Sequence, residues 1–305
     1  MGGEVHNRRA RYCFVGESLQ DPVLSTVLGS RQPSGSGKSM DEVGRTSDRE
    51  HEGWYSLNTQ AEAPVRAATY LGDNSFPIMG DLVRYLAGVT GIEVALDTAS
   101  ARSTATAYQQ APALDLVWMC GYPTALLIST GRTSHEVVAA PIFAGHGEPI
   151  YHSVIIARAD GPSSLRAALE TRLAVNEVES WSGFLGLKAH IERSFPGAWF
   201  VDQTVTGSHR ASIQAVADQA CDVAAIDITI WEHVLATEPA AAANVRVIDR
   251  TADWPAPPFT LGSHLDPTIR KSLTAALVAV GPVDVPSLDG VVAAGCAIYR
   301  DVMLA

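Results

Sequence analysis

The sequence has few cysteines, a deficit of basic residues and no long apolar run. Its four cysteines, Cys13, Cys120, Cys221 and Cys296, lie far apart and form no CxxC pair, so they provide neither a disulfide framework nor a zinc knuckle. The 22 basic residues are outnumbered by 33 acidic ones, which gives a net charge of −11. Binding to nucleic acid or to anionic membranes needs a basic face, and we expect neither partner. No stretch approaches the ~20 apolar residues of a membrane span.

Length and composition predict an ordinary folded protein. The chain has 305 residues, of which 47% are hydrophobic and 18% charged, which is enough for two domains. Arg8, Arg9 and Arg11 precede only a short, interrupted apolar patch, which is not the apolar core of a secretory signal. From the sequence as written we therefore expect a cytoplasmic protein.

The first 64 residues differ in composition from the rest. They are rich in Gly, Ser, Arg, Asp and Glu and show no helical or strand period, so we predict a disordered leader over residues 1–64. Residues 35–39 (GSGKS) look like the end of a phosphate-binding P-loop, but Gln32 stands where the first glycine belongs. No apolar strand precedes this run, which favours a flexible linker. Met40 offers an alternative start, which leaves open whether residues 1–39 are native.

From Arg66 onward, short apolar runs alternate with helical patterns, in two series. The predicted strands are VRAATYL, IEVAL and LDLVWM in the first series, and YHSVIIARAD, RLAVN, AWFVDQTV and CDVAAID in the second. The tail adds a strand at VRVID and a helix from Pro267 to about Val280. Strands that alternate with helices predict an α/β fold with mostly parallel sheets covered on both faces.

The two series predict two lobes. The C-terminal segment has no obvious core of its own, so we expect it to return to the first lobe. The predicted lobes are residues 65–148 plus 245–305 and residues 149–244, joined by two hinge strands. In such a fold a ligand lies between the lobes, at the carboxyl ends of strands.

Polar residues follow the predicted strands at several junctions. Ser180, Ser182 and Gly183 begin the helix after RLAVN, and a helix start with hydroxyls and free amides attracts an anion. His209 begins the helix after the strand AWFVDQTV, and Asp227 ends the strand CDVAAID. Each has a plainer interpretation: Ser180 and Asp227 can cap their helices, and His209 can be structural.

The second series resembles a known family. The resemblance rests on three motifs: the turn Asn-x-x-x-Ser-x-Ser-Gly at 176–183, Thr-Gly-Ser-His-Arg-Ala-Ser at 206–212 and Asp-Val-Ala-Ala-Ile-Asp at 222–227. These motifs are similar to those of the phosphate/phosphite/phosphonate-binding proteins of ABC importers, which have the type II periplasmic-binding-protein fold. The resemblance extends more loosely over residues 66–280.

The resemblance implies a two-lobed α/β protein that closes on a small oxyanion, a phosphonate above all, for import by an ABC permease. The residues that it implies at the ligand are Ser180, Trp181, Ser182, Gly183, His209, Asp227, Tyr122 and Asn74. Trp181 replaces the small residue often found between the two serines. Asp227 suits a protonated phosphorus acid or an amine on the ligand. The family is periplasmic, in contrast to the cytoplasmic expectation above, and we expect a monomer without a cofactor.

Alternatives remain open. An enzyme would need serine, histidine and aspartate in hydrogen-bonded series, but no GxSxG elbow surrounds the serines. The scattered His146, His152, His209 and His233 match no metal motif, so we expect no metal. A cytoplasmic sensor domain that binds an oxyanion is the third alternative.

Overall fold

The computed structural model describes residues 63–72, 74–98 and 111–299, all within one unit, Thr59–Ala305. The predicted disordered leader, apart from its last two residues, lies outside these residues. Among the described residues, no helix is both long enough and apolar enough to cross a membrane.

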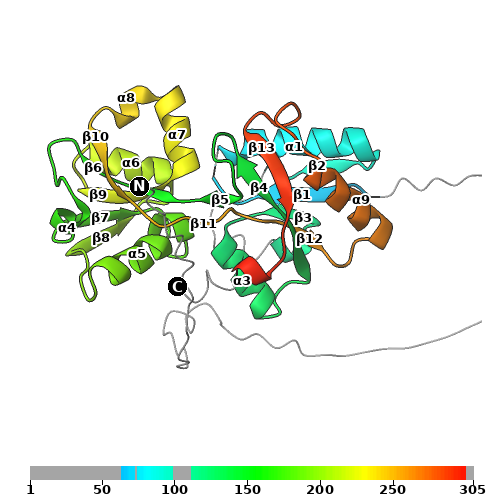
Figure 1. The fold of residues 1–305 in the computed structure, drawn as a ribbon, viewed down its shortest axis with the longest axis horizontal. Coiled ribbons are helices and arrows are strands. Elements are labelled where there is room, and N and C mark those ends of the chain that lie inside the picture. Colours follow the sequence, from blue (N-terminus) through cyan, green and yellow to red (C-terminus); the bar gives the residue numbers. More distant parts are fainter. Residues whose placement is uncertain (1–62, 73, 99–110, 300–305) are drawn as a thin grey trace, which may run out of the picture. The chain divides into compact units, whose positions relative to one another are not determined.

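Strands and helices alternate along most of the chain (Figure 1). The first half contains β1 (Val65–Thr69), α1 (Ser75–Thr90), β2 (Val94–Leu96), η2 (Ala111–Ala113), β3 (Leu116–Trp118), α3 (Gly121–Ser129), β4 (His135–Phe143), β5 (Ile150–Tyr151), β6 (Ser153–Arg158), α4 (Leu165–Ala168) and β7 (Arg172–Val175). The second half contains η3 (Trp181–Leu185), α5 (Gly186–Ser194), β8 (Asp202–Val205), α6 (His209–Ala217), β9 (Val223–Asp227), α7 (Ile228–Thr237), α8 (Pro239–Ala242), β10 (Val245–Arg250), β11 (Trp254–Pro255), β12 (Phe259–Gly262), α9 (Pro267–Val278) and β13 (Leu288–Ala293).

The first sheet has six strands in the order β13-β4-β12-β3-β1-β2. Its successive residues face two apolar clusters, because side chains of a strand alternate between faces. Ala67 and Trp118 belong to the cluster that contains Met79 of α1, whereas Ala68 and Val117 belong to the cluster on the α3 side. Helices therefore cover both faces of this sheet, as the continuous apolar strands predict.

The second sheet has five strands in the order β10-β6-β9-β7-β8. Ile156 and Ala224 pack on the side of α6 and α7, and Ile155 and Val223 pack on the side of α4 and α5. Both sheets are mixed rather than mostly parallel. Strands β1 and β7 each have two parallel neighbours, but β12, β13, β6 and β10 pair antiparallel. The expectation of mostly parallel sheets was wrong, because strands that arrive without a crossover helix can run in either direction.

Two short strands connect the sheets. Strand β5 leads from the first sheet to the second, β11 leads back, and the two pair antiparallel through Tyr151 and Trp254. Strand β10 departs from the expectation. The predicted boundary at residue 245 assigned it to the first lobe, whereas it pairs with β6 in the second sheet. Only after Arg250 does the chain return to the first sheet, because β10 first covers the open edge of β6.

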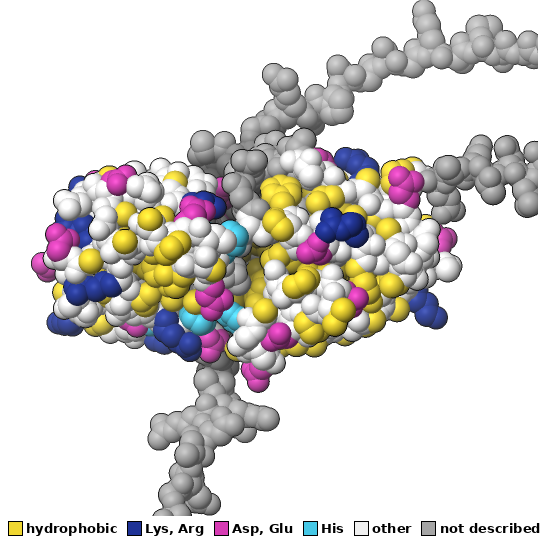
Figure 2. All heavy atoms as spheres, turned by 90° about the horizontal axis from the view of Figure 1, so that it is seen from above, with side chains coloured by type: hydrophobic (Ala, Val, Ile, Leu, Met, Phe, Trp, Pro, Cys, Tyr) yellow, Lys and Arg dark blue, Asp and Glu magenta, His cyan; other side chains and the backbone are white. Residues whose placement is uncertain are grey.

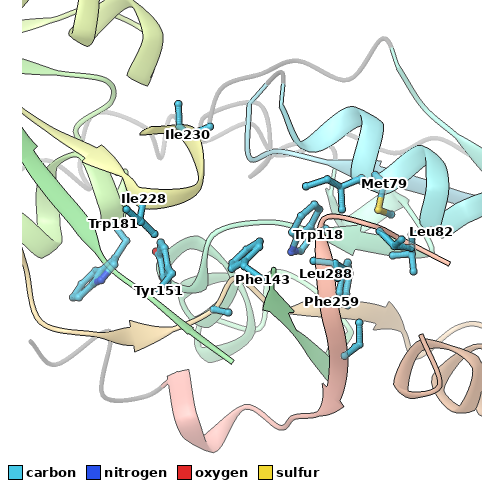
Figure 3. Packing of buried hydrophobic residues seen from close by; sticks show 14 of the residues in the cluster. Met79, Leu82, Trp118, Phe143, Tyr151, Trp181, Ile228, Ile230, Phe259 and Leu288 are labelled. Atoms are coloured by element: carbon cyan, nitrogen blue, oxygen red, sulfur yellow. The ribbon is translucent and has the colours of Figure 1, made fainter. Parts of the chain in front are cut away.

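Buried hydrophobic side chains form one continuous cluster through both sheets (Figure 3). The cluster runs from Leu82 on α1 through Trp118, Phe143 and Tyr151 to Ile228 at the start of α7. Trp118 stacks on Phe259 with ring centroids 5.2 Å apart. The connecting region is therefore packed as core.

Charged side chains are scattered over the surface seen in Figure 2. Lys and Arg side chains stand among acidic ones on this face and form no continuous basic area. This distribution fits the net charge of −11 and offers no basic footprint for nucleic acid on the face shown.

Protonation of His135 is expected to destabilise the first sheet. This buried ring lies 2.9 Å from Thr260 Oγ1 through Nδ1 and 2.8 Å from the Leu114 carbonyl oxygen through Nε2. Burial lowers the pKa of His135, and nearby His264 lowers it further, whereas the Leu114 carbonyl and Asp115 act in the opposite direction. Since the unfolded chain binds this proton more readily, the free energy of unfolding falls as the pH drops below about 6.5.

Urea unfolding at pH 7.5 and pH 5 measures this effect. We expect His135→Gln to lose less stability between the two pH values than the native protein does. Equal losses of unfolding free energy in the native protein and in His135→Gln would contradict this role of His135.

Candidate functional site

Five strand ends face one cavity. Its volume is about 250 Å³, and its wall comes from the carboxyl ends of β1 and β3 in the first sheet and of β7, β8 and β9 in the second. The lining residues are Tyr70, Leu71, Gly72, Asn74, Cys120, Asn176, Glu177, Ser180, Ser182, Gly207, Ser208, His209, Arg210, Asp227, Ile230 and His233. Strand ends are the positions at which α/β folds bind ligands.

The helix start after β7 is a tight turn capped by Ser180. The Ser180 Oγ accepts a hydrogen bond from the Gly183 amide at 3.1 Å. Residues Trp181–Leu185 then form one π-helical turn before α5, a feature that often accompanies functional sites. This cap satisfies only the Gly183 amide, and the amides of Trp181 and Ser182 lie against the Cys120 sulfur.

Asn176 fixes this turn from the end of β7. Its Nδ2 donates to Ser180 Oγ at 3.0 Å and lies 3.4 Å from His209 Nε2. Its Oδ1 packs so closely on Gly183 that a Cβ at residue 183 would lie 1.6 Å from it. Residue 183 must therefore be glycine for the Asn176 side-chain amide to pack against this turn.

Ser182 and His209 meet across the two helix starts. The Ser182 Oγ lies 3.1 Å from His209 Nε2, and the Ser182 carbonyl accepts a hydrogen bond from Ser153 Oγ at 2.7 Å. Both side chains are buried. Burial lowers the pKa of His209, whereas Asp227 and the Ala225 carbonyl raise it. A neutral ring with its proton on Nδ1 accepts from Ser182 at Nε2.

Asp227 both caps a helix and brings a negative charge into the cavity wall. Its Oδ1 accepts hydrogen bonds from the Thr229 amide at 2.9 Å and the Thr229 hydroxyl at 2.8 Å. Within the described part of the chain, no hydrogen bond reaches Oδ2. The two interpretations of Asp227, cap and cavity residue, are therefore compatible.

Buried neutral groups surround this carboxylate. Burial above all, and Asp227 second, raise the pKa of the Cys120 thiol to about 11, against the lowering effects of the Tyr151 hydroxyl and the two backbone amides. Burial likewise raises the pKa of Tyr151. The Cys120 sulfur and the Tyr151 hydroxyl are 3.8 Å apart. Both groups are protonated at neutral pH.

Three of the residues predicted at the ligand do not line the cavity. Trp181 is buried, with its ring centroid 4.6 Å from that of Trp254 and 6.2 Å from that of Tyr122. Figure 3 shows Trp181 beside Ile228 at the end of the hydrophobic cluster. Gly183 lies under the Asn176 amide. The other five predicted residues, Asn74, Ser180, Ser182, His209 and Asp227, line the cavity.

Several cavity residues were not among those predicted. Tyr70 directly follows β1 and Cys120 lies two residues after β3, so the position of strand ends could have identified them. Ile230 and His233 follow Asp227 at intervals of three, which places all three on one face of α7.

The arrangement gives little support to catalysis or metal binding. Asp227 bonds to Thr229 rather than to His209, so the pair of Ser182 and His209 lacks the hydrogen-bonded acid of a triad. Across the described ranges, no three histidine, cysteine or acidic side chains are grouped to hold a metal ion.

Solved structures share this fold at low sequence identity. The binding-protein component of an ABC phosphonate transporter from Pseudomonas aeruginosa has 20% identity and a TM-score of 0.65, with 78% of this chain and 84% of that chain covered. PhnD1 from Prochlorococcus marinus, solved in complex with methylphosphonate, has 17% identity and a TM-score of 0.65, over 78% of this chain and 95% of its own. These similarities confirm the two-lobed fold.

The sequence comparisons identify the family. No curated protein sequence matches the chain. The model of the phosphonate ABC transporter periplasmic substrate-binding proteins matches residues 68–297, which confirms the resemblance carried by the motifs of the second series. This chain therefore belongs to the family of periplasmic substrate-binding proteins of phosphonate ABC transporters.

Proposed function

We propose that this protein captures a small phosphorus oxyanion, a phosphonate above all, in the cavity between its two sheets. The observation that carries the proposal is the convergence of Ser180, Ser182, His209 and Asp227 on one cavity. We further propose that it acts as a monomer in the periplasm and delivers its ligand to an ABC permease, as its family does.

The helix start supplies donors for the oxyanion. Ser180 Oγ already accepts from the Gly183 amide and the Asn176 side chain, so its own O–H is available to a ligand. The amides of Trp181 and Ser182 bond to the neutral Cys120 thiol, and an anion is the stronger acceptor. Hydrogen bonds to a charged group contribute about 1.5–3 kcal/mol each.

Asp227 selects the protonation state of the ligand. A fully ionised oxyanion next to this buried carboxylate is repelled, whereas a P–OH group can donate its proton to Oδ2. The site therefore favours a monoanion that keeps one proton, or an amine-bearing ligand. This requirement distinguishes a phosphonate from a sulfonate of the same shape.

Ser182→Ala is expected to weaken methylphosphonate binding about tenfold or more, because it removes a buried hydroxyl from the cavity wall and leaves His209 Nε2 without the donor that positions the ring. Thermal unfolding measures the loss, since ligand at about 100 times its Kd should raise the midpoint by several degrees. Ser164→Ala is the matched control: Ser164 caps α4 through the Ala167 amide and does not line the cavity. An unchanged shift in Ser182→Ala would contradict the proposal.

Asp227→Asn is expected to reduce discrimination against sulfonates. The native protein should bind methanesulfonate at least about tenfold more weakly than methylphosphonate, because the sulfonate has no proton for the carboxylate. In the variant an amide Nδ2 can donate to an unprotonated oxygen, so the two affinities should approach each other. Calorimetry with both ligands gives the ratio.

The matched control is Asp266→Asn, which changes a carboxylate that caps α9 through the Thr268 amide and lies outside the cavity wall. In the native protein, methylphosphonate affinity should fall as rising pH removes the ligand's second proton, and this fall should be smaller in Asp227→Asn. If Asp227→Asn loses affinity for methylphosphonate and for methanesulfonate by the same factor, Asp227 does not recognise the proton of the phosphonate.

A further inference from the structure

Asn74 holds an acceptor that no described protein group uses. The residue lies between β1 and α1 and lines the cavity. Its Oδ1 is buried and has no hydrogen-bond partner among the residues that the structure describes. An unpaired buried acceptor is unfavourable, and such an atom in a native structure calls for a specific explanation. In a binding cavity, a donor on the ligand provides one.

The local sequence explains why this oxygen is free. An asparagine before a helix usually accepts a hydrogen bond from the second or third helical amide. In α1 the third residue is Pro77, which has no N–H, and the Asn74 side chain makes no capping bond. The turn is held instead by Ser75, whose Oγ donates to the Gly72 carbonyl at 2.6 Å and lies 2.8 Å from Thr69 Oγ1.

The described wall around Asn74 is neutral. The other described residues of the first sheet that line the cavity are Tyr70, Leu71, Gly72 and Cys120, and none of them is an Asp, Glu, Lys or Arg. Acidic and basic lining residues such as Asp227 and Arg210 come from the second sheet. An ammonium group beside Asn74 would be desolvated with no anion among these described residues of the first sheet, whereas a hydroxyl needs only a neutral acceptor.

We propose that Asn74 selects phosphonates whose organic group carries a hydroxyl, in preference to plain alkylphosphonates. The inference rests on the proposed function: the phosphonyl group binds at Ser180, Ser182 and His209, and its substituent extends toward the first sheet. There the hydroxyl donates to Asn74 Oδ1.

Calorimetry with two pairs of ligands tests this preference. Hydroxymethylphosphonate is compared with ethylphosphonate, and 2-hydroxyethylphosphonate with propylphosphonate, because each pair has the same number of non-hydrogen atoms. We expect the native protein to bind the hydroxylated member of at least one pair about tenfold or more tightly, since a site built to bond a hydroxyl rejects the analogue that lacks it.

Two variants separate recognition from shape. Asn74→Leu keeps the approximate size and removes the acceptor, so the preference should fall to twofold or less or reverse. Asn74→Asp keeps an acceptor oxygen, so it should retain the preference even if both affinities fall. Neither change removes a capping bond of α1. Asn244→Leu, at an asparagine distant from the cavity wall, is the control and should keep the native ratio.

The outcomes separate this inference from the proposed function. If all four phosphonates bind and neither pair differs by more than twofold in the native protein, the role of Asn74 is refuted and the proposed function stands. If aminomethylphosphonate binds more tightly than hydroxymethylphosphonate, the proposed preference for a neutral hydroxyl over an ammonium group is refuted. If no phosphonate binds, both proposals fall together.

Discussion

The fit of the Asn176 side chain against Gly183 decides where the polar groups of the cavity can lie. A Cβ at residue 183 would lie 1.6 Å from Asn176 Oδ1, so the chain can close this turn over the amide only with glycine there. The side-chain Nδ2 of Asn176 then donates to Ser180 Oγ and approaches His209 Nε2. The same ring nitrogen contacts Ser182 Oγ. One side chain at the end of a buried strand thus connects two helix starts. The donors of the cavity are positioned before any ligand arrives, which reduces the conformational entropy that binding must overcome.

Burial then determines the charge of the cavity. It lowers the pKa of His209 and raises those of Cys120 and Tyr151, so all three groups are neutral at neutral pH. Asp227 is the exception in this part of the site, and its cap bonds to Thr229 leave one oxygen unbonded among the described residues. Neutral donors beside the Asp227 carboxylate suit a ligand that brings both a negative charge and a proton. The family match over residues 68–297 is consistent with that chemistry.

The limits of sequence analysis are clearest at β4, β10 and Trp181. Pro141 interrupts the apolar run of β4, yet the strand continues and Pro141 pairs with Val291. Such pairing cannot be inferred from local pattern, since proline usually argues against a strand interior. The family resemblance implied that Trp181 contacts the ligand. The π-helical turn directs its ring toward Trp254 instead, and local periodicity does not encode that direction.

The sequence by itself determined the alternation of strands and helices, the strand ends at which polar residues collect, and the family to which its motifs belong. These features depend on local patterns of apolar residues and caps, which act within a few residues of each other. Tertiary structure alone decided that Tyr70 and Cys120 of the first sheet share a cavity with Ser182 and Asp227 of the second. It also decided that Asn74 Oδ1 has no bond to any described residue. Those outcomes depend on contacts between segments distant in the chain, because the packing of two sheets sets which strand ends face each other.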